Sequence, residues 1–102
     1  MQRNIHLAIY DLTKGSFQEL ADLAKGGMLP NFSKESGFVE YGIADVSNRK
    51  VCSISIWETR DQAEKAVHLT STWVQQNVSD RVRLVTSYVG DLAFLAGSPV
   101  YA

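Results

Sequence analysis

Two segments of this chain are apolar on both sides of a strand, and this feature limits the folds that the chain can adopt. In residues 5–10 and 51–57 the side chains alternate with the period of two that is typical of β-strands. One alternating set is Ile5, Leu7, Ile9, Cys52, Ile54 and Ile56, and the other is His6, Ala8, Tyr10, Val51, Ser53, Ser55 and Trp57. A solvated sheet face would carry charged side chains or threonine at many of these positions. The alternation therefore predicts a sheet that is covered on both faces.

Two further segments begin with the sequence signals of a helix N-terminus. Ser16 and Glu19 form a capping box ahead of an apolar stripe, and Thr59 and Gln62 form a second one. The apolar residues behind the second box recur at helical spacing as far as Val78, which predicts a helix of about 18 residues. The sequence thus predicts two helices.

The remaining strands complete the predicted order of elements. Residues 38–46 and 51–57 are β-rich runs joined by the hairpin turn 47–50, and residues 83–89 form the last strand. The order is strand, helix, strand, strand, helix, strand, which matches the split βαβ arrangement. We therefore predict an α+β fold, the ferredoxin-like βαββαβ sandwich, in which two helices lie on one face of an antiparallel sheet.

Two stretches fit more than one local structure. Gly26–Gly27 either ends the first helix or kinks it before Met28–Lys34, since two glycines cost about 2 kcal/mol of helix propensity and Pro30 lacks an amide donor. Leu92–Ala96 is too apolar for a free tail, so we expect it to be packed, either against a partner or as a further short strand at the sheet edge.

The second sheet face has no helix of this chain to cover it. Glu40 and Arg83 are charges within the predicted strands, but the apolar sets dominate both faces. An exposed apolar face of this size is typical of an interface. We therefore predict that residues 1–102 form a single domain that packs through its sheet against a second copy, giving a homodimer.

Composition excludes several classes of partner. The chain has 102 residues, and 10 Lys and Arg against 11 Asp and Glu give a net charge of -1, so we expect no nucleic-acid partner. Its uncharged stretches are shorter than the about 20 apolar residues that a membrane helix needs. The first residues lack the apolar core of a secretion signal, which predicts a cytoplasmic protein and no membrane partner.

The same sequence lacks the usual signals for a cofactor. Cys52 is the single cysteine, and with His6 and His68 it makes no recognised ligand spacing, so neither a disulfide nor a metal site is predicted. No phosphate-binding or dinucleotide-binding glycine motif occurs. We therefore predict no cofactor.

Three short motifs connect these elements to a known family. They are Leu12-Thr13-Lys14-Gly15 after the first strand, Ser36-Gly37-Phe38 before the second, and Ile54-Ser55-Ile56-Trp57-Glu58 before a capped helix. Over about residues 5–90 the chain resembles the antibiotic-biosynthesis monooxygenase family of dimeric α/β-barrel proteins. The resemblance implies a pocket between sheet and helices. Its members are cofactor-free oxygenases of polycyclic or quinol substrates, haem-degrading enzymes, or proteins without a known reaction.

The haem-degrading members of that family use an Asn on the first strand with a Trp and a His on the second helix. When the chains are aligned on Gly15 and Trp57, those three positions hold Ala8, Ala66 and Gln76. The residues that such chemistry needs are therefore absent.

Six residues are candidates for substrate binding, because each combines a predicted strand position with an aromatic ring or a hydrogen-bonding group: Trp57, Ser55, Ser53, His6, Tyr10 and Tyr41. Trp57 has the strongest case, since the resemblance places a pocket wall at its strand end. Simple core packing is the alternative for it, as it is for His6. The two serines either leave room for a ligand or fit closely against the helices.

No catalytic residue can be assigned from the sequence. Glu40 has no second carboxylate on its strand face with which to divide acid and base roles. His68 lies about 150° around the helix from the centre of the apolar stripe and is expected to point outward. Two functions stay open, a cofactor-independent monooxygenase of an aromatic or quinol-like molecule, and a non-catalytic dimeric module that binds a hydrophobic small molecule or a protein.

Overall fold

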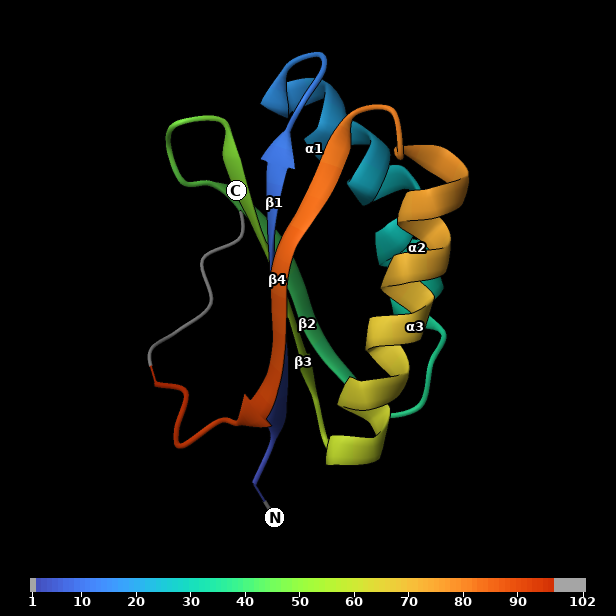
Figure 1. Cartoon of the computed structure of the whole chain (residues 1–102). Coiled ribbons are helices and arrows are strands. Elements are labelled where there is room, and N and C mark those ends of the chain that lie inside the picture. The colour runs from blue at the N-terminus through green and yellow to red at the C-terminus, as the bar shows by residue number, and fades with distance from the viewer. Residues whose placement is uncertain (1, 97–102) are drawn as a thin grey trace.

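A computed structural model describes residues 2–96 of the chain. Four strands form one antiparallel sheet in the order β2-β3-β1-β4, and the helices all cover the same face of it (Figure 1). The elements are β1 (Asn4–Leu12), α1 (Phe17–Gly26), α2 (Met28–Ser33), β2 (Phe38–Asp45), β3 (Lys50–Trp57), α3 (Arg60–Asn77) and β4 (Val82–Asp91). The predicted α+β, ferredoxin-like fold is confirmed.

Both predicted capping boxes are formed. The Ser16 hydroxyl accepts from the Glu19 amide at 3.1 Å, and the Glu19 carboxylate accepts from the Ser16 amide at 2.9 Å. The same reciprocal pair joins Thr59 and Gln62, at 3.2 and 3.1 Å. Because each box satisfies amides that lack a partner within the helix, α1 and α3 begin where the sequence predicts.

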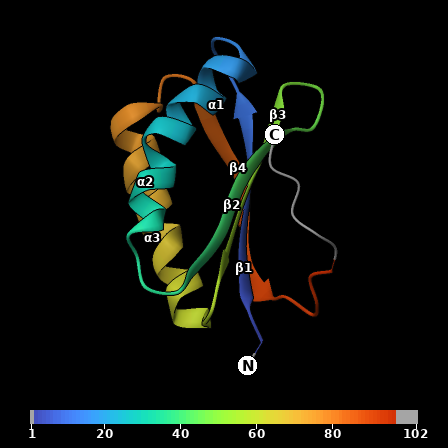
Figure 2. The same ribbon diagram turned by 180° about the vertical axis from the view of Figure 1, so that it is seen from behind.

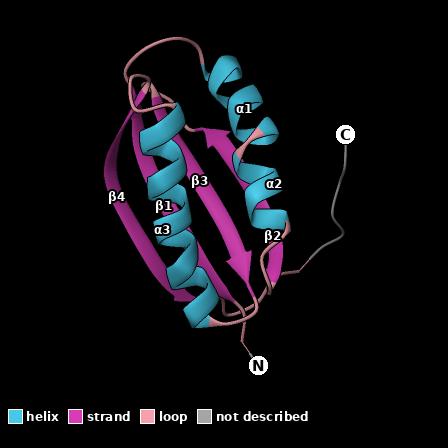
Figure 3. Cartoon of the chain, turned by 90° about the vertical axis from the view of Figure 1, so that its right-hand side faces the viewer, coloured by secondary structure: helices cyan, strands magenta, loops and turns pink. Residues whose placement is uncertain are grey.

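The glycine pair separates two helices. α1 ends at Gly26, and Gly27 joins it to the short α2, whose last residue is Ser33. The Gly27 amide still donates to the Leu23 carbonyl at 2.9 Å, so the two helices follow one another along β2 (Figure 3). Of the two structures that the sequence allowed, a break followed by a resumed helix is the one formed.

Alternation along the two central strands separates a helix-covered face from an open face. In β1 the side chains of Asn4, His6, Ala8, Tyr10 and Leu12 are buried, whereas those between them remain partly exposed in a single chain. β3 pairs with β1 so that Ser55 lies opposite His6 and Ile54 opposite Leu7. Helices lie on one side of the sheet only, as the view from behind shows (Figure 2).

Of the two arrangements expected for Leu92–Ala96, the further short strand is not formed. The Leu92 amide donates to the Arg3 carbonyl at 2.9 Å, and beyond it the chain leaves the sheet on the side away from the helices (Figure 1). Phe94 and Leu95 are 79% and 54% exposed. The physical reason is that β1 begins at Asn4, so no partner backbone continues beside these residues.

Candidate functional site

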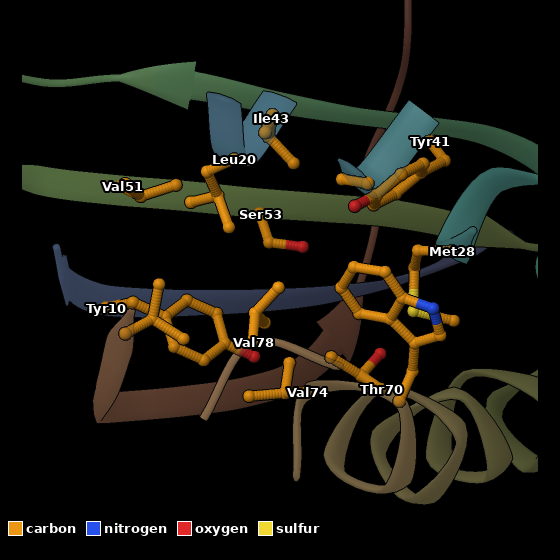
Figure 4. Close-up of a pocket in the computed structure, with 13 residues that line it drawn as sticks. Tyr10, Leu20, Met28, Tyr41, Ile43, Val51, Ser53, Thr70, Val74 and Val78 are labelled. Carbon is orange, nitrogen blue, oxygen red and sulfur yellow. The ribbon is translucent and has the colours of Figure 1, made fainter. Parts of the chain in front are cut away.

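A small cavity lies between the sheet and the helices. Its volume is about 30 Å³, which is room for roughly one or two water molecules. Strands supply one wall and α1, α2 and α3 the other (Figure 4). Its lining is mostly aliphatic, with no charged side chain among the described residues: Tyr10, Leu20, Ala24, Met28, Tyr41, Ile43, Val51, Ser53, Thr70, Trp73, Val74, Val78 and Val82. A ligand larger than water must therefore move part of this wall.

Two phenols line the cavity and stay protonated in it. Burial raises the pKa of Tyr10 to about 12. Burial likewise raises the pKa of Tyr41 to about 12, although a hydrogen bond with Ser53 opposes the rise. At neutral pH both side chains are therefore hydrogen-bond donors and neither is a base.

Thr70 adds a hydroxyl without a partner. Its side chain projects from α3 toward the strands (Figure 4), the residue is only 6% exposed, and its Oγ1 has no hydrogen-bond partner in the described part of the chain. A buried hydroxyl left unpaired costs about 1–3 kcal/mol, so such groups are rare in folded proteins. An oxygen or nitrogen atom of a bound ligand would satisfy it.

Thr70 was not predicted as a site residue from the sequence. It stands within the apolar stripe of α3, where its spacing indicated core packing. The sequence signal that could have indicated it is a hydroxyl within the apolar stripe, where the neighbours at helical spacing are Ala66, Val67, Trp73 and Val74.

The six predicted binding residues fall into two groups. Tyr10, Tyr41 and Ser53 line the cavity. Trp57, Ser55 and His6 face the same helices but lie outside its wall, in the packed interior beside it: they are 1%, 1% and 3% exposed.

Trp57 belongs to a tight aromatic cluster. Its ring meets those of Phe32 and Phe38 edge to face, with centroids 5.3 and 5.5 Å away. The indole NH donates to the Ser55 hydroxyl at 2.9 Å, so both polar groups are satisfied within the core. Tyr41 links this cluster to the cavity, because its ring packs edge to face on Phe32 at 5.1 Å.

His6 is buried as a neutral side chain. Burial lowers its pKa below the ordinary value of 6.5, and its Nε2 has no hydrogen-bond partner among residues 2–96. His68 is exposed on α3, as its wheel position predicted.

We expect His6 to make the fold sensitive to mild acid. Because its pKa is lower in the folded than in the unfolded chain, its contribution is fully present above pH 6.5 and is lost as the pH falls toward the folded value. In that window the free energy of unfolding should drop by up to about 1.4 kcal/mol per pH unit. Urea unfolding at pH 7 and pH 5 should show this drop in the natural protein and in His68→Gln, and a smaller one in His6→Gln. Equal drops in all three would exclude His6 as the cause.

Metal-ligating side chains do not cluster within the described residues. No three His, Cys, Asp or Glu side chains within residues 2–96 lie close enough together to hold a metal ion. The positions aligned with the haem-degrading residues hold Ala8 and Ala66, both fully buried, and the exposed Gln76. In the same range, no helix is long and apolar enough to cross a membrane.

Comparison with known proteins gives matches in structure and none in sequence. No known protein family and no curated protein matches the chain. Solved structures that share its fold include the following three. A dimeric ferredoxin-like protein from an uncultured marine organism is 10% identical, with 94% of this chain and 99% of that chain covered and a TM-score of 0.68. A protein from Nitrosomonas europaea, proposed to be an antibiotic biosynthesis monooxygenase, is 15% identical, with 95% and 97% covered and a TM-score of 0.67.

The third structure is a variant of SnoaB, a cofactor-independent oxygenase from Streptomyces nogalater. It is 14% identical, with 98% of this chain and 100% of that chain covered and a TM-score of 0.64. Together these matches support the resemblance to the antibiotic-biosynthesis monooxygenase family. At such identities, what this chain shares with these proteins is the fold.

Proposed function

We propose that the protein is a cofactor-independent monooxygenase that binds a small hydroxyaromatic or quinol-like molecule between its sheet and helices. The observation that carries this proposal is the unpaired Thr70 hydroxyl in an uncharged cavity that two phenols and Ser53 also line. Apolar walls suit an aromatic ring, and a few hydroxyls suit its oxygen substituents. The shared fold with a cofactor-independent oxygenase supports the same class of reaction.

In this proposal the substrate supplies the electrons. A phenolate is electron-rich enough to reduce oxygen. One oxygen atom becomes a carbonyl at a ring carbon that carried one hydrogen, which converts the phenol to a quinone. The hydrogen of that carbon and the phenolic proton leave with the other oxygen atom as water. The hydroxyl groups of Tyr10, Tyr41 and Thr70 would donate to the phenolate oxygen, as preformed donors do for developing oxyanions. Since no group lining the cavity is a base at neutral pH, the substrate must lose its proton before or during entry.

Replacing Thr70 with valine should separate function from stability. Valine matches threonine in shape and removes only the unpaired hydroxyl, so the free energy of unfolding should rise by about 1 kcal/mol. Oxygen uptake with a dihydroxynaphthalene substrate should fall about tenfold, equivalent to about 1.4 kcal/mol of transition-state stabilisation. Ser71→Ala, which removes a hydroxyl on the exposed side of α3, is the matched control. It should leave oxygen uptake unchanged and change the free energy of unfolding by less than about 0.5 kcal/mol. Uptake by Thr70→Val at the natural rate would contradict the proposal.

A non-catalytic binding module is the second candidate function. The absence of an acid–base group among the described cavity-lining residues favours it, because binding needs only shape and donors. Oxygen uptake distinguishes the two: a protein that binds hydroxyaromatics and consumes no oxygen with any of them is a binding module.

We also propose that the working form is a homodimer joined through the open sheet face. A neighbour with this fold is a dimeric ferredoxin-like protein, and the open face of β1 and β3 presents Ile5, Leu7, Ile9 and Ile54. Cytoplasmic location stays a prediction from the sequence.

A further inference from the structure

The Trp73 side chain stands between the cavity and the surface. It lines the cavity, and it also lines a surface pocket of about 270 Å³ between α2 and α3. Among the described residues it is the one that the two spaces share. Thr70, whose unpaired hydroxyl faces the cavity, lies one turn earlier on the same helix. The indole therefore separates this hydroxyl from the surface pocket.

Gly27 provides the space in which the indole rests. A Cβ atom at this position would lie 2.6 Å from the indole Nε1 and 2.8 Å from Cζ2, closer than real side chains approach. Its φ of -118° is accessible to any residue, so glycine is required here for space and not for its backbone conformation. At the neighbouring Gly26, an added Cβ would meet nothing within 4 Å.

Packing holds the indole in place. Trp73 is hydrogen-bonded to the side chain of Asn77, whose amide Nδ2 donates to the Trp73 backbone carbonyl at 2.9 Å. The indole takes no part in this hydrogen bond. The residue is only partly buried. Rotation of its side chain would therefore break no such bond, and rotations of partly exposed side chains are fast.

A second surface pocket offers the competing route. It lies at the β2 edge, has a volume of about 260 Å³, and is separated from the cavity by Ala24, Tyr41 and Ile43. Two of these belong to a strand whose backbone is paired with β3. Passage there has to displace three residues, one of them an alanine whose side chain cannot turn aside, whereas passage at Trp73 needs one side chain to turn.

We propose that the Trp73 side chain is the gate of the cavity and that hydroxyaromatic ligands enter between α2 and α3. In the closed position the indole packs against Gly27, which has no side chain to obstruct it. This inference rests on the proposed binding of such a ligand in the cavity, but not on the oxygen chemistry. Trp73 is then a specificity-determining residue, since the width that it opens limits the ring system that can pass.

The test is the rate at which 1-naphthol associates, measured by stopped flow from the emission of the naphthol itself. Gly27→Ala places a methyl group against the indole and should raise the association rate constant at least fivefold. Trp73→Ala removes the gate and should raise it at least tenfold. Gly26→Ala makes the same change of residue type one position away, where space is open, and should stay within twofold of the natural protein.

A second readout follows the gate directly. In the Trp57→Phe background Trp73 is the one remaining tryptophan, because the chain has two. Acrylamide should quench its fluorescence more strongly in Gly27→Ala than in Gly26→Ala. Circular dichroism confirms that each variant is folded.

Three results would overturn the gate. One is an association rate in Gly27→Ala equal to that of Gly26→Ala; another is a rate that rises with Leu29→Ala, at the β2-edge pocket, and not with Gly27→Ala. The third is that neither the natural protein nor Trp73→Ala binds 1-naphthol. Faster binding in Gly27→Ala without oxygen uptake would keep the gate and reject the monooxygenase.

Discussion

Replacing Trp57 with alanine is expected to lower the free energy of unfolding by about 3–5 kcal/mol, the range for removing a large buried aromatic side chain. Trp57 is 1% exposed and packs edge to face on Phe32 and Phe38. Its loss leaves a cavity at the junction of β2, β3 and α2, and it leaves the Ser55 hydroxyl without its indole donor. Urea unfolding at pH 7 measures the change.

Trp57→Phe is the matched control. It keeps an aromatic ring in the cluster and removes the indole hydrogen bond, so it should cost about 1–2 kcal/mol. If the free energy of unfolding of Trp57→Ala were within about 1 kcal/mol of that of the natural protein, the aromatic cluster would not be a main source of stability.

This expectation changes how the proposed activity should be tested. A loss of turnover in Trp57→Ala would follow from a loosened core as readily as from a lost substrate contact. Substitutions that delete a single oxygen atom from the cavity wall avoid this problem. Tyr41→Phe, Ser53→Ala and Thr70→Val each remove one hydroxyl and leave the surrounding shape almost unchanged.

Local signals explain why the elements could be predicted from the sequence. Each capping box involves residues three apart, so Ser16 with Glu19 and Thr59 with Gln62 specify a helix start without reference to the rest of the chain. Strand alternation has the same local character. It correctly placed Ser53 and Ser55 on the face of Trp57, and all three are buried under the helices.

The membership of the cavity could not be predicted in this way, because it depends on how far each element slides along its neighbours. Ser53 and Ser55 share a strand face, yet of the two only Ser53 lines the cavity. The Ser55 hydroxyl instead accepts a hydrogen bond from the Trp57 indole. Gly27 shows the same limit. Gly26 and Gly27 have the same helix propensity, so the sequence does not distinguish them. The difference is that Gly27 lies against the indole of Trp73, a residue 46 positions later in the chain.

The open sheet face has a second property that alternation did not reveal. One end of it carries an ion-pair cluster, in which the Asp11 carboxylate accepts from Lys50 and from Arg83, the latter at 2.7 Å. These hydrogen bonds lower the pKa of Asp11 and keep it ionised. Glu40, which pairs with Ile56, lies toward the opposite end. The centre of the face, around Leu7 and Ile54, is left to apolar side chains.

A carboxylate at the centre of that face should therefore abolish the proposed homodimer. Ile54 lies on an interior strand, opposite Leu7 in β1 and Gly42 in β2, so Ile54→Asp places a charge where the partner would exclude water. A two-fold interface buries the substitution twice, and burying an unpaired charge costs several kcal/mol. A total of about 4 kcal/mol raises the dissociation constant about a thousandfold.

Sedimentation equilibrium at micromolar concentration measures this outcome. The natural protein should have twice the mass of one 11.3 kDa chain, and Ile54→Asp should have the mass of a single chain with an unchanged helical circular dichroism signal. Ser71→Asp adds the same charge on the exposed side of α3 and should remain dimeric. A monomeric natural protein would refute the homodimer, and a dimeric Ile54→Asp would place the contact elsewhere. The result also bears on residues 92–96, which leave the sheet on this same side (Figure 1). Phe94 and Leu95 are exposed in the single chain, and the dimer would offer them a partner to pack against.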